Sequence, residues 1–334
     1  MARFDRKLLL GVVHWAIPWI SLAIGIAGAL LMDRGPSRGA AVAVVAVSSW
    51  LVLTVVLWLE RKREHQPGGT TKVLRTARFS ALMLTQSSIH LQLYFALPFY
   101  LKAFAGTFAH VVFMALLGGA ALASLWDPLT EWLLVRSRGG ILLPAFSTFC
   151  VMAAVLPGLG LSNGTSLWCA AGAAGLALPV MVFADRLHGR PLARAVATAV
   201  VAGLVFPLAL ALGGARAVPA VPMGLVDAAI GTRRVGYEIT DPTERLERTP
   251  ARLVCATSIF APLGVHDHLV HVWRKDGEVM DRIGLEIRGG REAGFRTYSV
   301  KQNFGASPTG EWSCAVETEM GQFLGERRIV IGPA

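Results

Sequence analysis

The chain has 334 residues, of which 54% are hydrophobic and only 16% charged, and its mean hydropathy is +0.52. This composition excludes an ordinary soluble protein and indicates a membrane protein. The net charge of +10 is uneven, because residues 1–226 hold 18 Lys/Arg and 7 Asp/Glu, whereas residues 227–334 hold 14 and 15. The basic excess therefore belongs to the apolar part of the chain, and no nucleic-acid partner is expected.

Apolar stretches of 18–24 residues recur in the first two thirds of the chain. A helix of this length crosses a hydrocarbon core of roughly 30 Å at about 1.5 Å per residue. The pattern predicts seven transmembrane helices, at residues 8–31, 40–59, 79–99, 107–126, 140–161, 166–183 and 193–212. We therefore expect an all-α helical bundle over residues 1–213, followed by a second domain.

The orientation follows from the basic residues between these stretches. The N-terminal tail and the even-numbered loops hold fourteen Lys/Arg, and the opposite side holds four, namely Arg34, Arg38, Lys102 and Arg216. Such an excess is typical of cytoplasmic loops, so the N-terminus is expected in the cytoplasm. Seven crossings would then place the C-terminal domain on the other side of the membrane.

The third apolar stretch contains the polar segment TQSSIHLQLYF, residues 85–95. On a helical projection Gln86, Ser87, His90 and Tyr94 share one face, and Gln92 lies on a second. Neither face should contact lipid, because an unpaired polar group in hydrocarbon costs a few kcal/mol. These side chains either hydrogen-bond across helices or line a functional polar cavity around His90, with His14 or His110 as partner.

The segment WDPLTEW at residues 126–132 supplies the paired carboxylates of Asp127 and Glu131 near the cytoplasmic end of a predicted span. They are interpreted first as the N-cap and first turn of a short interfacial helix, with acid–base chemistry as the alternative. His90 and Asp127 would lie too far apart for one active site.

After a linker at residues 214–226, the hydrophobic period falls toward two, which is typical of strands. Six strands are predicted, at residues 252–260, 268–274, 281–288, 295–301, 311–318 and 327–331. Residues 227–334 are therefore expected to form a small all-β sandwich-like domain, with Trp273 and Trp312 in its core.

The alternation along the predicted strands places the side chains of Cys255 and Cys314 on the inner faces of their strands. They are expected either to form a disulfide in an oxidising compartment or to remain two buried thiols. His266 and His268 share a strand face without a third convergent ligand, so no metal is expected.

The segment from His271 to Ile331 resembles the bacterial family catalogued as domain of unknown function 2914. The resemblance lies in the Trp-x₂-Asp-Gly turn at Trp273, the R-T-Y-S strand at Arg296, the Gly-x-Trp at Gly310 and the last strand after Gly325. The helical part, with QLYFALPFY and WDPL, is similar to the family catalogued as domain of unknown function 5924. These resemblances imply a protein of the bacterial inner membrane with a periplasmic β domain, and they transfer no catalytic residue.

The sequence contains no P-loop, no strand-linked GxGxxG, no nucleophile elbow and no haem-attachment motif. We expect a protein that binds no cofactor and is not an enzyme. Its periplasmic domain is expected to bind a partner protein, a glycan or a lipid headgroup. The alternative is a transporter or lipid-handling protein that uses the polar third helix.

Overall fold

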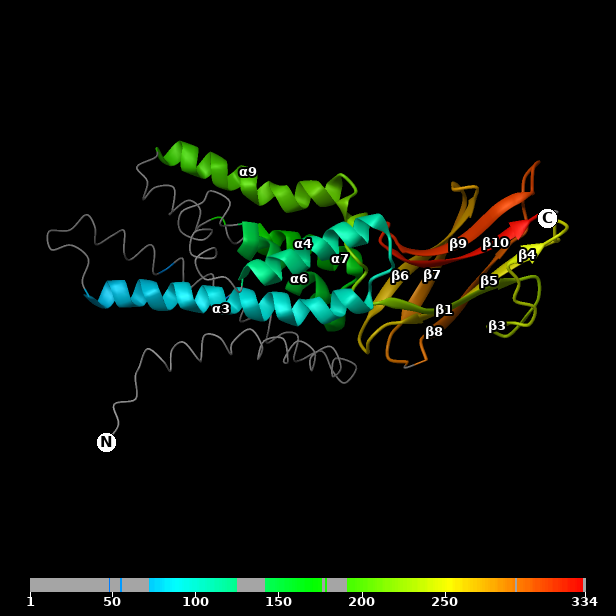
Figure 1. Cartoon of the computed structure of the whole chain (residues 1–334), viewed down its shortest axis with the longest axis horizontal. Coiled ribbons are helices and arrows are strands. Elements are labelled where there is room, and N and C mark those ends of the chain that lie inside the picture. Colours follow the sequence, from blue (N-terminus) through cyan, green and yellow to red (C-terminus); the bar gives the residue numbers. More distant parts are fainter. Residues whose placement is uncertain are drawn as a thin grey trace, which may run out of the picture.

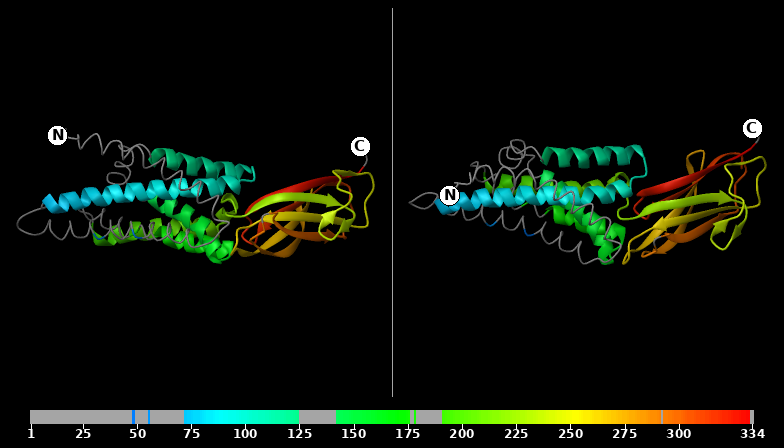
Figure 2. Two further views of the ribbon diagram at one scale, coloured as in Figure 1. Left: turned by 90° about the horizontal axis from the view of Figure 1, so that it is seen from below. Right: turned by 60° about the horizontal axis from the view of Figure 1, so that its bottom comes forward.

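The computed structural model describes residues 72–124, 142–175, 191–291 and 293–332, together with the isolated positions Ser48, Val55 and Leu178. These residues form a helical part and a β part, which lie end to end in Figures 1 and 2. The α-helices are α3 (Lys72–Lys102), α4 (Phe108–Ser124), α6 (Leu142–Val155), α7 (Asn163–Ala174) and α9 (Leu192–Ala211). Two 3₁₀ helices, η3 (Leu156–Leu159) and η5 (Gly214–Ala217), follow α6 and α9.

The predicted fold class, with about seven transmembrane helices, is wrong. The described residues contain five α-helices, and only the segments Leu142–Leu159 and Leu192–Ala211 are long and apolar enough to cross a membrane. Helix α3 is long enough, but the polar residues in its middle lower its hydropathy. Helix α4 has 17 residues and α7 only 12, so α7 spans about 18 Å at 1.5 Å per residue. The first two predicted spans lie outside the described residues, apart from Ser48 and Val55.

Helix α9 has the strongest membrane character among the described helices. Its sequence begins after Pro191, which adopts an extended conformation at the N-cap, and only 11% of its apolar window is buried. Large hydrophobic side chains remain exposed along its length, at Leu192, Val196, Val200, Val201, Leu204, Val205 and Leu208. A helix that is apolar on its exposed side is suited to lipid.

The β part is built from two larger sheets and a small hairpin. The three-stranded sheet has the order β1–β5–β8, from β1 (Gly224–Gly231), β5 (Leu253–Phe260) and β8 (Phe295–Lys301). The five-stranded sheet has the order β4–β10–β9–β6–β7. Its strands are β4 (Arg245–Leu246), β6 (His266–Lys275), β7 (Glu278–Arg288), β9 (Gly310–Thr318) and β10 (Phe323–Ile331). Strands β2 (Arg234–Val235) and β3 (Glu238–Ile239) form the hairpin at the end farthest from the helices (Figure 1).

The two larger sheets face each other across a common core. Ile230, Leu253 and Cys255 of the three-stranded sheet pack in one cluster with Trp273 and Trp312 of the five-stranded sheet. Both tryptophans are completely buried, which confirms their predicted place in the core. The six predicted strands correspond to β5–β10, whereas β1 begins inside the segment that was interpreted as a linker.

The helical and β parts are joined by direct hydrogen bonds. The main-chain N–H of Asn163, at the start of α7, donates to Asp267 Oδ2 on β6 at 2.9 Å. The Asn163 side-chain amide donates to the carbonyl of Val221 at 2.9 Å, and Gln322 Nε2 donates to the carbonyl of Val218 at 3.0 Å. Because these groups are buried, the contacts hold the β part against the helix ends.

Candidate functional site

The polar segment of α3 makes hydrogen bonds to two neighbouring helices. Gln92 Nε2 donates to Ser88 Oγ at 2.8 Å, and Gln92 Oε1 accepts from Ser147 Oγ at 3.0 Å and from Thr148 Oγ1 at 3.1 Å on α6. All four side chains are buried. The oxygen of the Gln92 amide therefore joins α3 to α6, while its NH₂ group bonds Ser88 within α3.

The other polar face of α3 contacts α4. His90 Nε2 hydrogen-bonds the carbonyl oxygen of Ser124, and the Tyr94 hydroxyl donates to the carbonyl oxygen of Ala121 at 3.3 Å. Gln86 is also buried, at 5% exposure, whereas the side chain of Ser87 lies outside the described residues. The candidate residues thus divide between two helix contacts, which is the arrangement expected of interhelical packing.

The proposed histidine pair is not brought together. His90 contacts the C-terminal end of α4, whereas His110 lies near its N-terminal end, where its Nδ1 accepts from the main-chain N–H of Ala105 at 3.3 Å. Fourteen positions separate His110 from Ser124, or about 21 Å along a helix. His14, Asp127 and Glu131 lie outside the described residues.

The core of the β domain contains the cysteine pair that was singled out in the sequence and, beside it, His271, which was not. A disulfide joins Cys255 on β5 to Cys314 on β9, so it connects the two sheets. Next to it lies His271, which is fully buried; its Nε2 hydrogen-bonds Thr257 Oγ1 at 2.9 Å and its Nδ1 hydrogen-bonds Ser299 Oγ at 2.8 Å. The alternation Leu269, His271, Trp273 already placed this histidine on the inward face of its strand.

Burial fixes the protonation state of this histidine. It lowers the pKa of His271 from the ordinary 6.5 to about 4, because the charged imidazolium loses its hydration. The ligand atoms of Cys255, His271 and Cys314 lie within 4.8 Å of one another, a spacing compatible with a metal ion. The two sulfurs are bonded to each other, however, and both ring nitrogens have hydrogen-bond partners. Cysteine binds a metal ion as the thiolate, which a disulfide does not offer. With the disulfide formed, this group is therefore part of the packed core.

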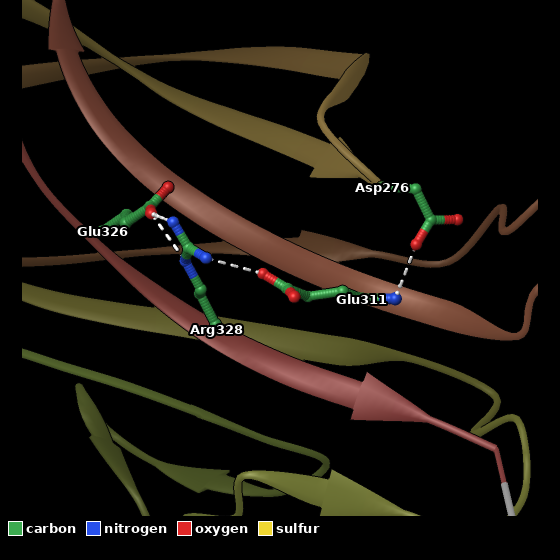
Figure 3. Close-up of polar contacts among 4 residues, drawn as sticks. All are labelled: Asp276, Glu311, Glu326 and Arg328. Carbon is green, nitrogen blue, oxygen red and sulfur yellow. Dashed lines mark hydrogen bonds and ion pairs between the residues drawn. The ribbon is translucent and has the colours of Figure 1, made fainter.

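The outer face of the five-stranded sheet carries a network of ion pairs and hydrogen bonds around Arg328 (Figure 3). Arg328 Nε donates to Glu326 at 2.7 Å and its Nη1 donates to Glu311 at 2.9 Å, and these carboxylates raise the pKa of Arg328. Asp276 accepts from the main-chain N–H of Glu311 at 2.9 Å, which lowers the pKa of Asp276. Two shallow hollows of about 510 and 500 Å³ adjoin these residues. Because the charged residues that line these two hollows are paired, this part of the face is suited to solvation rather than to a reaction.

A third hollow, of about 520 Å³, lies on the three-stranded sheet beside the β2–β3 hairpin; we call it the hairpin groove. Small residues form part of its lining, namely Ala229, Ala256 and Ser258. Beside them Tyr237 is 53% exposed and its ring meets that of Tyr298 edge-on at 5.9 Å. Arg296 and Glu238, which also line the groove, form an ion pair at 2.7 Å. The groove therefore combines an exposed aromatic ring, hydroxyls and both signs of charge, which is the chemistry of a binding surface.

No curated protein and no solved structure matches the chain. Two family models do match, in the order that the sequence resemblance implied. Residues 266–331 match the model described as Protein of unknown function (DUF2914). Residues 6–261, which include all the helices described above and the first strands of the β part, match the other model. The chain belongs to the family described as Family of unknown function (DUF5924).

Proposed function

We propose that this protein is a noncatalytic component of the bacterial inner membrane, whose helices anchor a periplasmic β domain that binds a partner protein, a glycan or a lipid headgroup. The hairpin groove carries this proposal. It is a hollow of about 520 Å³ on β1 and β5 beside the β2–β3 hairpin, and this hairpin lies at the end of the β part farthest from the helices, so a partner can reach the hairpin side of the groove from outside the membrane.

The orientation is supported by the ends of α3. Lys72, Arg75 and Arg78 occupy the end of this helix that lies away from the β domain, and Arg194 lies at the corresponding end of α9 (Figure 1). Basic residues concentrate on the cytoplasmic side of membrane proteins. The disulfide between Cys255 and Cys314 is in keeping with a periplasmic location, since disulfides persist in oxidising compartments.

We do not extend the proposal to transport through the polar segment of α3. The Gln92 amide, His90 and Tyr94 are engaged with neighbouring helices, as described above. A transport site needs polar groups that can exchange these partners for a substrate.

The test uses photo-crosslinking in intact cells. A benzoyl-phenylalanine placed at position 237, in the hairpin groove, is compared with the same residue at position 279, where Val279 on β7 is 49% exposed. We expect an adduct at position 237 alone, which weakens when Arg296 is replaced by Gln. Mass spectrometry of the adduct identifies the partner as protein, glycan or lipid. Equal labelling at both positions, or none at position 237, would contradict the proposal.

A further inference from the structure

The base of the β domain lies at the level where the membrane helices end. A methyl group at Gly264, in the turn between β5 and β6, would lie 3.1 Å from the carbonyl oxygen of Gly158 in η3. The ammonium of Lys102, the last residue of α3, lies 4.8 Å from the ring centre of Phe260. Because the apolar segment Leu142–Leu159 ends here, this turn lies where the hydrocarbon core would give way to headgroups.

A second turn lies directly beside the first and completes this base. The main-chain N–H groups of Gly289 and Gly290, between β7 and β8, donate to the carbonyls of Val265 and Ala261, both at 2.9 Å. Gly290 has a φ of +100°, and a methyl group on Gly289 would lie 1.9 Å from the carbonyl oxygen of Pro262. The close approach of the two turns and the backbone conformation therefore require this glycine pair.

The side chains of the base combine one apolar group with arginines. Leu263, in the turn between β5 and β6, is 54% exposed. Arg288 and Arg291 are exposed on the neighbouring turn, and the Arg291 guanidinium lies 5.3 Å from the Phe295 ring centre. The nearby exposed carboxylates are Glu286 and Glu319.

These arginines differ from those on the sheet faces. Arg274, Arg296, Arg327 and Arg328 each pair with a carboxylate. Within the part of the chain that the structure describes, Arg288 and Arg291 have no such ion pair. An exposed leucine flanked by arginines, at the level of the helix ends, matches the surface of a bilayer with anionic headgroups.

We propose that the base of the β domain, formed by Leu263, Arg288 and Arg291, binds anionic phospholipid headgroups on the periplasmic surface of the membrane in which the helices lie. Leu263 enters the layer below the headgroups, and the two guanidinium groups contact the phosphates. This inference rests on the proposed membrane location.

The experiment uses the full chain in lipid nanodiscs, with Cys150 and Cys169 replaced by Ser so that the disulfide is the remaining native cysteine pair. Single cysteines at positions 263, 235 and 201 carry an environment-sensitive fluorophore. Val235, in the distal hairpin, and Val201, on α9, are 71% and 67% exposed, so all three labels are accessible. Quenching is measured with nitroxide phosphatidylglycerol and with nitroxide phosphatidylcholine.

We expect quenching at positions 263 and 201, and none at position 235. At position 263 phosphatidylglycerol should quench more strongly than phosphatidylcholine, with a preference of roughly five-fold for each engaged arginine at low salt. The variant Arg288→Gln/Arg291→Gln should abolish this preference while the label at position 201 is unaffected. The same quenching at positions 263 and 235 would overturn the inference, as would equal quenching by the two lipids. Absence of quenching at position 201 would instead overturn the membrane location.

Discussion

The main-chain N–H of Asn163 donates to the carboxylate of Asp267 at 2.9 Å, although the two residues lie 104 positions apart in the chain. Asp267 Oδ1 accepts a second main-chain N–H, from His268, at 2.9 Å. Ser162 caps the same helix, because its Oγ accepts from the N–H of Thr165 at 3.2 Å. A residue of the β domain therefore completes the capping of α7, and the two halves of the chain share one structural element.

Replacement of Asp267 by Ala should loosen this junction. It leaves the main-chain N–H groups of Asn163 and His268 without this acceptor, and because that of Asn163 is buried we expect a cost of about 1–3 kcal/mol. Amide hydrogen exchange of a peptide that covers residues 160–168 should accelerate by roughly 10- to 100-fold, while the peptides of β9 and β10 change little. His268→Ala, at the exposed neighbour, is the control. Equal acceleration throughout the β domain would show instead that the whole domain has unfolded.

The stability of the β domain should fall in mild acid because of His271. Its pKa is about 4 in the folded state and about 6.5 when exposed, so between these values the unfolded chain binds a proton that the folded chain does not. The free energy of unfolding should therefore decrease as the pH is lowered from 6.5 to 4, by up to about 3 kcal/mol.

This pH dependence is measured from the tryptophan fluorescence of the full chain during thermal unfolding, at several values of pH. The variant His271→Gln should lose most of the slope, whatever its stability at neutral pH. His268→Gln should keep the slope, because that histidine is exposed on the same strand. An unchanged slope in His271→Gln would assign the acid sensitivity to another group.

The disulfide should make a large contribution to the stability of the β domain. The bridge closes a loop of 59 positions between Cys255 and Cys314, which in the chain-entropy model stabilises the folded state by about 4 kcal/mol. The double variant Cys255→Ala/Cys314→Ala should therefore unfold at a lower temperature, whereas Cys169→Ala should not. Alkylation of the unfolded protein without reductant, followed by mass measurement, should leave residues 255 and 314 unmodified.

The Gln92 contacts should stabilise the packing of α3 against α6. Gln92→Leu removes three hydrogen bonds and leaves the hydroxyls of Ser147 and Thr148 without this acceptor. Interhelical hydrogen bonds in membranes contribute about 0.6 kcal/mol each on average, so a loss of about 1–2 kcal/mol is expected. This loss of stability is measured from the unfolding of the protein in mixed detergent micelles. Thr198→Ala on α9 is the matched control, because the hydroxyl of Thr198 bonds only the carbonyl of Arg194 in its own helix.

The strands were predictable because alternation is a local signal. The run at residues 295–301 coincides with β8, and the inward parity of Cys255 and Cys314 agrees with their meeting in the core. The number of spans was not predictable from apolar length alone, because hydropathy does not report where a helix begins or ends. The apolar stretch at residues 166–183, for example, begins inside α7, which starts at Asn163 and is described to Ala174.

The candidate site residues were likewise predictable only in part. Helical periodicity separated the polar residues of α3 into two faces, and the structure has Gln92 contacting α6 and His90 contacting α4. The partner of His90 is a main-chain carbonyl, however, and periodicity carries no information about such an acceptor. Likewise the Asn163–Asp267 contact depends on how two distant segments meet, and the hairpin groove depends on the short strands β2 and β3, which have no alternating pattern of their own.

Strand β7 ends the five-stranded sheet, and among the described residues no further strand pairs with its outer side. Its eleven residues include Glu278, Asp281, Arg282, Glu286 and Arg288. Charged side chains on such an edge oppose the addition of another strand. Neighbouring copies of the protein are therefore not expected to join through β7 into continuous sheets, so each β domain remains individually accessible.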